Sequence, residues 1–294
     1  MTFLKSILLS LALFSSYALP CASCGSGGDD PLILYPNEKW KLYLGESRTF
    51  NYKNISSKGE YVTAGGVTSK DQLTFSSGVS FSERAFSTIA VPMILNHVEQ
   101  GSRFAFGDPS LAARYTFVLP SIADPVFLPQ VQLIAGYKQA ISRSIRETLA
   151  PKTLVDVFGT GFSEAKLGVD VWYGLYDFKL GMAWTLVQPF SRTFGDGSYS
   201  PSLGNRLTFT LGYQWNYSLR TTAGINRDYK GTLSKDGETL AESDQLNYGF
   251  FMTQDLLAWD GYTFRLSYAR QAALLTNRNT SQIDSLSLAC MKAF

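Results

Sequence analysis

Apolar and polar residues alternate one by one along many short stretches of this chain. In residues 206–215 one face carries Leu207, Phe209, Leu211, Tyr213 and Trp215, and the residues between them are polar or small. Successive side chains of a β-strand point to opposite faces, whereas an apolar helix face needs spacings of three and four residues. This stretch therefore predicts a strand with one apolar and one polar face. About ten residues are also enough to cross a bilayer as a tilted strand.

The same alternation recurs along the chain and predicts about twelve strands. They cover residues 40–52, 72–81, 86–95, 110–119, 130–138, 165–173, 178–186, 206–215, 219–226, 246–252, 262–268 and 285–294. Long connections, such as 96–107, 142–162 and 230–244, follow the odd-numbered strands, and short turns follow the even-numbered ones. An even strand number with long loops on one side is typical of bacterial outer-membrane barrels. The sequence thus predicts an all-β fold, a transmembrane antiparallel up-and-down β-barrel spanning 40–294, with both termini in the periplasm.

Aromatic residues near the expected strand ends support a membrane location. They are Trp40, Tyr115, Tyr137, Tyr173, Trp184, Trp215 and Tyr262, and such residues form girdles at membrane interfaces. The alternative fold is a secreted soluble sandwich or a pair of domains, in which the apolar faces would turn to a core. A dozen long apolar faces exceed one sandwich core, and a sandwich gives no reason for the alternation of loop lengths.

Composition agrees with a barrel but does not select it. The 294 residues are 45% hydrophobic and only 17% charged, below the roughly 25% charged residues of an average soluble domain. The formal net charge of +2 gives no indication of a nucleic-acid partner. After the N-terminus no apolar run reaches the length of a membrane helix.

The N-terminus is typical of a secretory signal peptide over residues 1–18. Lys5 supplies the positive charge, residues 7–14 form a short apolar core, and Ser16 and Ala18 suit a small-x-small cleavage site. A short membrane anchor is the alternative, although the apolar core is far below spanning length. Lipid attachment at Cys21 or Cys24 is a further alternative, with poorly matching flanking residues.

Residues 19–39 form a predicted periplasmic leader rich in cysteine and glycine. In an exported protein Cys21 and Cys24 favour a local disulfide, and binding of copper or another soft metal is the alternative. Gly25 stands where haem attachment needs histidine. No cofactor is expected.

The chain resembles Gram-negative outer-membrane β-barrels of the porin-like transporter kind. The resemblance rests on the export signal, on the Gly-Asp pair that opens residues 107–115, and on the final strand ending in Phe294. A terminal phenylalanine is similar to the signal read by the barrel-assembly machinery, although Lys292 stands where that signal usually has an apolar residue. The resemblance implies a bacterial outer-membrane location, with lipid and lipopolysaccharide as surroundings, better than it implies a solute.

If the apolar faces contact lipid, the polar faces line a lumen. The predicted lumen side chains are Arg114, Lys138, Lys166, Asp170, Lys179, Arg206, Arg220 and Arg265. This wall is mainly basic, and basic rings favour anions in a pore. We therefore expect a passive channel for small polar or anionic solutes. The alternative is a plugged barrel, in which carboxylates such as Glu147, Asp156 or Glu164 pair with the basic residues and the outer loops bind a partner.

An outer-membrane lipase or protease is the third alternative, and the sequence gives it little support. The chain has a single histidine, His97, followed by Val98 and Glu99 rather than by the serine and asparagine of a barrel phospholipase. A histidine exposed or packed in a loop is the more ordinary interpretation. We expect no enzyme.

Overall fold

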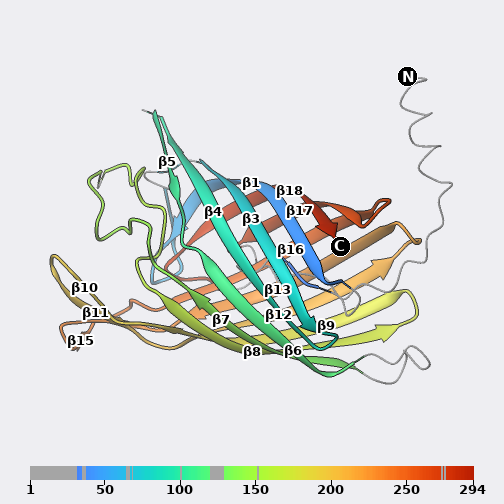
Figure 1. Ribbon diagram of the computed structural model, residues 1–294. Helices are drawn as coiled ribbons and strands as arrows, with labels where there is room; N and C mark the ends of the chain where they lie inside the picture. The colour runs from blue at the N-terminus through green and yellow to red at the C-terminus, as the bar shows by residue number, and fades with distance from the viewer. Residues whose placement is uncertain are drawn as a thin grey trace.

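The computed structural model describes residues 32–34, 38–63, 67, 69–99, 101–119, 129–150, 152–272, 274 and 276–294 (Figure 1). The predicted signal peptide and the pair Cys21 and Cys24 lie outside the described residues. Within the described part, twelve strands form one closed sheet. They are β1 (Trp40–Ile55), β3 (Ser69–Ser82), β4 (Ala85–Val98), β6 (Ser110–Val118), β7 (Gln130–Lys138), β8 (Glu164–Leu175), β9 (Phe178–Pro189), β12 (Gly204–Gln214), β13 (Leu219–Lys230), β16 (Gln245–Leu257), β17 (Tyr262–Gln271) and β18 (Thr280–Ala293).

Each of these strands pairs antiparallel with its neighbours in the chain, and the first strand pairs with the last. The β1–β18 pairing runs from Lys41 opposite Ala293 to Ile55 opposite Thr280. No edge strand is left among the twelve, so the backbone hydrogen bonds of the ladder are satisfied within the sheet. The predicted fold, an up-and-down barrel of about twelve strands, is confirmed.

The C-terminal residue takes part in the closure. The Phe294 N–H donates to the Trp40 carbonyl at 2.8 Å, and the two rings lie 5.4 Å apart. Lys292, the residue that departs from the expected terminal pattern, bonds Asp260 at 2.6 Å in the β16–β17 turn. Its ammonium also lies 4.2 Å from the Tyr262 ring centre. A long side chain can thus place its charge at the barrel rim while its stem lies on the apolar face.

The burial of side chains is the reverse of that in a soluble protein. On β12 Thr208 and Thr210 are 2% and 7% exposed, whereas Phe209 and Leu211 between them are 45% and 48% exposed. A soluble sandwich would bury the apolar residues against a second sheet. The sandwich alternative is therefore wrong, because the polar faces turn to the barrel interior and the apolar faces outward. No helix in the described part of the chain is long and apolar enough to cross a membrane.

Long and short connections lie at opposite ends of the barrel (Figure 1). Several connections that the sequence assigns to polar loops contain strands. β4 continues through Asn96 to Val98 and pairs with β5 (Gly101–Phe106), so the expected loop 96–107 is a hairpin. β2 (Tyr61–Thr63) pairs antiparallel with the end of β1. A separate four-stranded sheet contains β10 (Arg192–Phe194), β11 (Gly197–Pro201), β14 (Leu233–Lys235) and β15 (Glu238–Thr239). Beyond the apolar belt both strand faces meet water, so the alternation that predicts strands disappears there.

Candidate functional site

The interior of the barrel holds the side chains that the sequence predicts for a lumen. All eight lie on strand faces opposite the exposed apolar residues: Arg114 on β6, Lys138 on β7, Lys166 and Asp170 on β8, Lys179 on β9, Arg206 on β12, Arg220 on β13 and Arg265 on β17. Lys166, Lys179 and Arg206 are partly exposed, and the other five are buried. The structure distributes these residues over the full height of the interior.

At the short-turn end, two arginines share one carboxylate. Arg220 on β13 and Arg265 on β17 both bond Asp255 on β16, and the Arg265 Nε lies 2.7 Å from the carboxylate. The strand register places the three residues directly side by side, Arg220 opposite Asp255 and Asp255 opposite Arg265. The sequence analysis missed Asp255. Continuing the alternation of residues 246–252 three residues further would have placed it on the polar face.

Near the middle, Arg114 and Asp170 pair across strand β7. The closest nitrogen and oxygen are 3.5 Å apart, and both side chains are almost fully buried. Gln132 on β7 donates to Thr116 at 3.0 Å. Asp170, the one carboxylate predicted for the lumen wall, is therefore held by a basic wall residue rather than left to face a solute.

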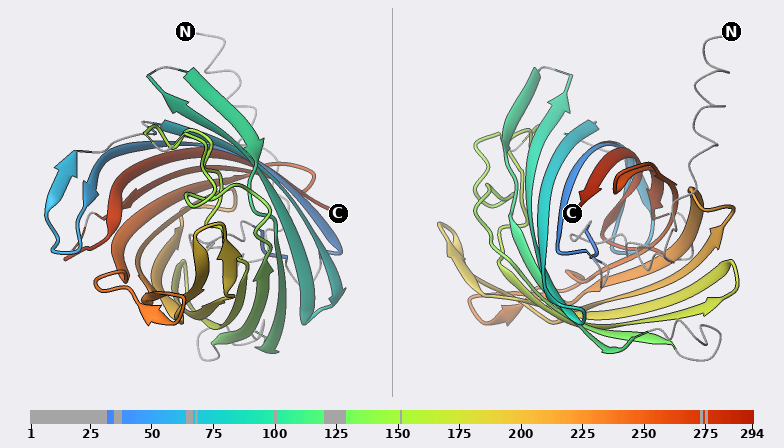
Figure 2. Two further views of the ribbon diagram at one scale, coloured as in Figure 1. Left: turned by 90° about the vertical axis from the view of Figure 1, so that its left-hand side faces the viewer. Right: turned by 45° about the vertical axis from the view of Figure 1, so that its right-hand side comes forward.

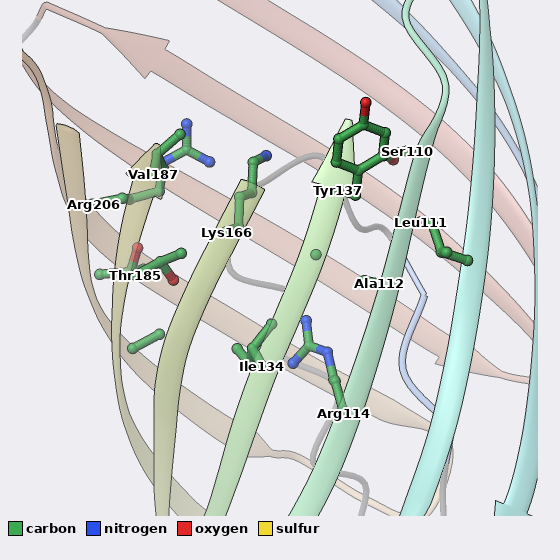
Figure 3. A pocket seen from close by; sticks show the side chains of 13 residues that line it. Ser110, Leu111, Ala112, Arg114, Ile134, Tyr137, Lys166, Thr185, Val187 and Arg206 are labelled. Carbon is green, nitrogen blue, oxygen red and sulfur yellow. The ribbon is translucent and has the colours of Figure 1, made fainter. Parts of the chain in front are cut away.

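At the long-loop end, Lys138 pairs with Glu164 at 2.8 Å and Arg206 with Asp228 at 2.8 Å. Figure 3 shows Lys166, Arg206 and Arg114 around one hollow of about 70 Å³ in the wall. The carboxylates that these basic side chains meet in the interior are Glu164, Asp170, Asp228 and Asp255, and most of these charges are paired.

Of the three carboxylates expected to pair with basic lumen residues in a plugged barrel, Glu147, Asp156 and Glu164, only one does so. Glu164, at the start of β8, pairs with Lys138. Glu147 instead pairs with Arg192, and Asp156 with Arg143, within and beside the connection 139–163. The loop carboxylates therefore stabilise the loop itself, and the wall supplies its own acidic partners.

The connection 139–163 folds against the inner wall at the long-loop end. The Asp108 carboxylate accepts the N–H groups of Ile141, Ser142 and Thr160 at 3.1, 3.0 and 3.3 Å. Asn96 on the interior face of β4 donates to the carbonyls of Val155 and Val157 at 3.1 and 2.8 Å. These contacts hold the loop over the mouth of the barrel, as the left view of Figure 2 shows.

Gly159 allows the close approach that this loop needs. A Cβ atom there would lie 2.0 Å from the Ser142 hydroxyl and 2.5 Å from the Asp108 carboxylate. With any other residue the Ser142 hydroxyl and the Asp108 carboxylate would have to shift, because real Cβ atoms do not approach other heavy atoms so closely.

Asp156 is the buried acid at the centre of the loop. Burial alone would raise the pKa of its carboxyl, but the Thr148 hydroxyl, the Leu149 N–H and Arg143 donate hydrogen bonds to the charged form and lower the pKa to about 2. A carboxylate that accepts several hydrogen bonds favours ionisation in this way. The loop conformation is thereby coupled to the charge of Asp156.

A second segment occupies the interior from the short-turn end. Leu32, Ile33 and Leu34 are 0%, 4% and 4% exposed and pack with Phe86 and Met291. These two residues lie on the interior faces of β4 and β18.

The wall carries two adaptations to this segment. The Lys41 ammonium donates to the Ile33 carbonyl at 3.3 Å. At Gly78 a Cβ atom would lie 2.4 Å from Leu34 and 2.9 Å from Leu32. From the sequence these residues belong to the leader, and this contact was not expected. The apolar triplet at 32–34, isolated between polar residues, was the available signal.

His97, the histidine weighed as a catalytic base, lies on β4 and pairs with Asp71 on β3 at 2.9 Å. Its position on a strand corrects the expectation of a loop residue, because β4 continues past Asn96. No group of three or more histidine, cysteine, aspartate or glutamate residues in the described part of the chain is placed to hold a metal ion.

Comparison with known proteins supports the architecture. No protein-family model matches the chain, and no curated protein matches it. Among solved structures the barrel is similar to an outer membrane channel from Pseudomonas putida F1, with a TM-score of 0.66 at 11% identity, covering 87% of this chain and 96% of that one. NanC porin gives a TM-score of 0.49 at 8% identity, covering 85% and 99% of the two chains. At such identities the first likeness shows the shared barrel fold. It agrees with the fold that the outer-membrane resemblance implies.

We expect Asp255→Asn to lower the free energy of unfolding by about 3–5 kcal/mol, because it leaves two buried guanidinium groups without a full counter-charge. Asp228→Asn is the matched control. Its pair with Arg206 is partly exposed, so a loss of about 0–1 kcal/mol is expected. Urea unfolding of the protein refolded in lipid vesicles measures both. Equal decreases in the free energy of unfolding for the two variants would show that the Asp255 carboxylate is not essential to the charge balance of this cluster.

The backbone amides of the loop 139–163 should lose protection from hydrogen exchange in acid. Because the pKa of Asp156 is depressed in the folded loop, its stabilisation is complete above the ordinary value of 3.8 and is lost as the pH falls toward about 2. Hydrogen exchange, corrected for intrinsic rates, should show falling protection of the Phe158 amide between pH 4 and pH 2. Asp156→Asn should reduce protection at every pH and abolish this dependence, while amides of β12 serve as the control. Unchanged wild-type protection at pH 2 would contradict the assignment.

Proposed function

We propose that this protein is a bacterial outer-membrane channel for the passive passage of small polar, mainly anionic solutes. One observation supports the proposal: the closed barrel has an apolar outer face and a polar interior, in which the seven basic side chains predicted from the sequence meet the four carboxylates Glu164, Asp170, Asp228 and Asp255. In this arrangement the long loops are extracellular and the short turns and both termini are periplasmic. Membrane lipid and lipopolysaccharide surround the barrel, and the barrel-assembly machinery inserts it.

The basic residues of the interior differ in what they offer a solute. Arg220 and Arg265 are buried against Asp255, so their charges form ion pairs between neighbouring strands and are not accessible to a solute. Lys166 and Arg206 are partly exposed toward the interior and lie one strand apart, on β8 and β12 with β9 between them. Positive side chains that a solute can reach raise the local concentration of anions and exclude cations. Lys179 on β9 is partly exposed as well, so selectivity rests on Lys166, Lys179 and Arg206.

Two parts of the chain narrow the path, and they support a second candidate. The loop 139–163 covers the long-loop end, and residues 32–34 fill the inside of the short-turn end. A barrel closed at both ends would not conduct and would act through its loops as a receptor. We favour the channel because residues 32–34 and the loop 139–163 pack against the wall without being part of the barrel sheet. Either segment can move while the barrel stays closed.

The test of the channel is the reversal potential of the refolded protein in a planar bilayer under a salt gradient. We expect an anion preference, reduced when Lys166→Gln and Arg206→Gln are combined, because both changes remove accessible positive charge. Lys152→Gln is the control for net charge, since Lys152 is exposed on the loop surface. A cation preference in the wild type would overturn the selectivity, and no conductance from folded protein would favour the receptor.

Loosening residues 32–34 should raise the single-channel conductance. We expect an increase from Leu32→Ser, Ile33→Ser and Leu34→Ser together, because serine removes the apolar burial that holds the segment on the wall. The matched control is Ile141→Ser, Ile145→Ser and Leu149→Ser, three exposed side chains at the other end.

Conductance should rise in the first triple variant alone. An unchanged conductance in that variant would show that residues 32–34 do not obstruct the path.

A further inference from the structure

A cavity of about 340 Å³ lies between the loop 139–163 and the inner wall at the long-loop end. Strands β3 and β4, with Ser110 of β6 and Lys138 of β7, form the wall side, and residues 157–160 of the loop form the cover. The lining includes Lys70, Gln72 and Thr74 from β3, Ile94 from β4, and Phe158 and Thr160 from the loop.

Lys70 is the unusual charge in this cavity. It makes neither a hydrogen bond nor an ion pair with any residue that the structure describes, and Asp108 acts on it only through space. Its neighbour in the cavity, Lys138, is instead paired with Glu164. A partly buried ammonium without a hydrogen-bonded partner is costly unless a ligand supplies one. The sequence analysis missed Lys70, which continues the polar face of the strand one step before Gln72.

Asp108 does not serve as that partner, because its carboxylate is already in use. The N–H groups of Ile141 and Ser142 and the Ser142 hydroxyl donate to one oxygen, and the Thr160 N–H donates to the other. These hydrogen bonds fix the negative charge to the loop. The positive charge of Lys70 is thus left available on the cavity side, beside the hydrogen-bonding groups of Gln72 and Thr74.

The cavity also has an apolar lining. Ile94, which lies beside Gln72 in the β3–β4 register, and Phe158 on the loop are almost fully buried and line the same space as Lys70. A site with one cation, a few polar groups and an apolar surface matches a ligand with a charged head and a hydrocarbon part. We propose that this cavity is a binding site for small organic carboxylates, with Lys70 holding the carboxylate and Phe158 covering the apolar part.

This inference rests on the proposed function, since it names the class of anion that the channel transports and the site where that anion binds on its way. It can nevertheless fail or succeed separately from conduction, because binding is measurable without current. A site of this kind in a closed barrel would be the ligand site of a receptor.

Titration calorimetry on refolded protein in non-ionic detergent tests the site, with pentanoate as the probe and pentanamide as its uncharged counterpart. We expect pentanoate to bind and pentanamide to bind roughly tenfold or more weakly, because only the carboxylate brings a counter-charge to the Lys70 ammonium, whereas the amide offers a neutral oxygen acceptor. Lys70→Gln should weaken pentanoate binding by roughly tenfold or more and leave the weak pentanamide binding unchanged. Lys70→Arg should keep most of the wild-type affinity for pentanoate.

Two controls separate this site from general effects of charge and folding. Lys152→Gln removes the same charge from the exposed surface of the same loop and should leave pentanoate binding as in the wild type. Phe158→Leu keeps an apolar cover, whereas Phe158→Ala should weaken both probes. Equal binding of the two probes, or full pentanoate binding by folded Lys70→Gln, would overturn the proposal. Binding without conductance would keep the site and reject the channel.

Discussion

Closure of the sheet between β1 and β18 is the constraint on which the rest of this structure depends. In hydrocarbon an unpaired backbone N–H or carbonyl group is too costly to leave, so a β-sheet can cross a membrane only without edges. Once the strands close on themselves, every side chain must point either to the surroundings or to the interior. The apolar set is turned outward, and the polar set is confined to a narrow space where each charge needs a partner.

The interior meets that demand by pairing across neighbouring strands. Arg220, Asp255 and Arg265 are adjacent in register, and Arg114 reaches Asp170 across one strand. Buried charges of this kind stabilise little by themselves, yet losing one member leaves a costly unpaired charge. The paired residues therefore act as cross-links of the wall. Lys166, Lys179 and Arg206, the last paired with Asp228, are less buried than these cross-links.

The chain also fills its own barrel from both ends. Residues 32–34 supply an apolar core where the wall offers Phe86 and Met291, and Gly78 leaves the space for them. The loop 139–163 is built around two polar anchors, Asp108 and Asn96, and carries Phe158 into the interior. Both segments pack against the wall and are not part of the barrel sheet. Local elements with few contacts open at a lower free energy than the sheet does.

The sequence alone predicts the twelve strands of the barrel, the side of each strand that faces outward and the end at which the long loops lie, but not the six short strands beyond the barrel. Those predictions follow from an alternation of period two, which is a local property. It also identified eight interior side chains, but not their partners. Asp255, Lys70 and the triplet 32–34 lie just beyond the clear alternation, and their roles depend on residues far away in the chain. Only the tertiary structure decided them, because register between strands, the path of a loop and the packing of a segment inside the barrel depend on contacts that no local pattern records.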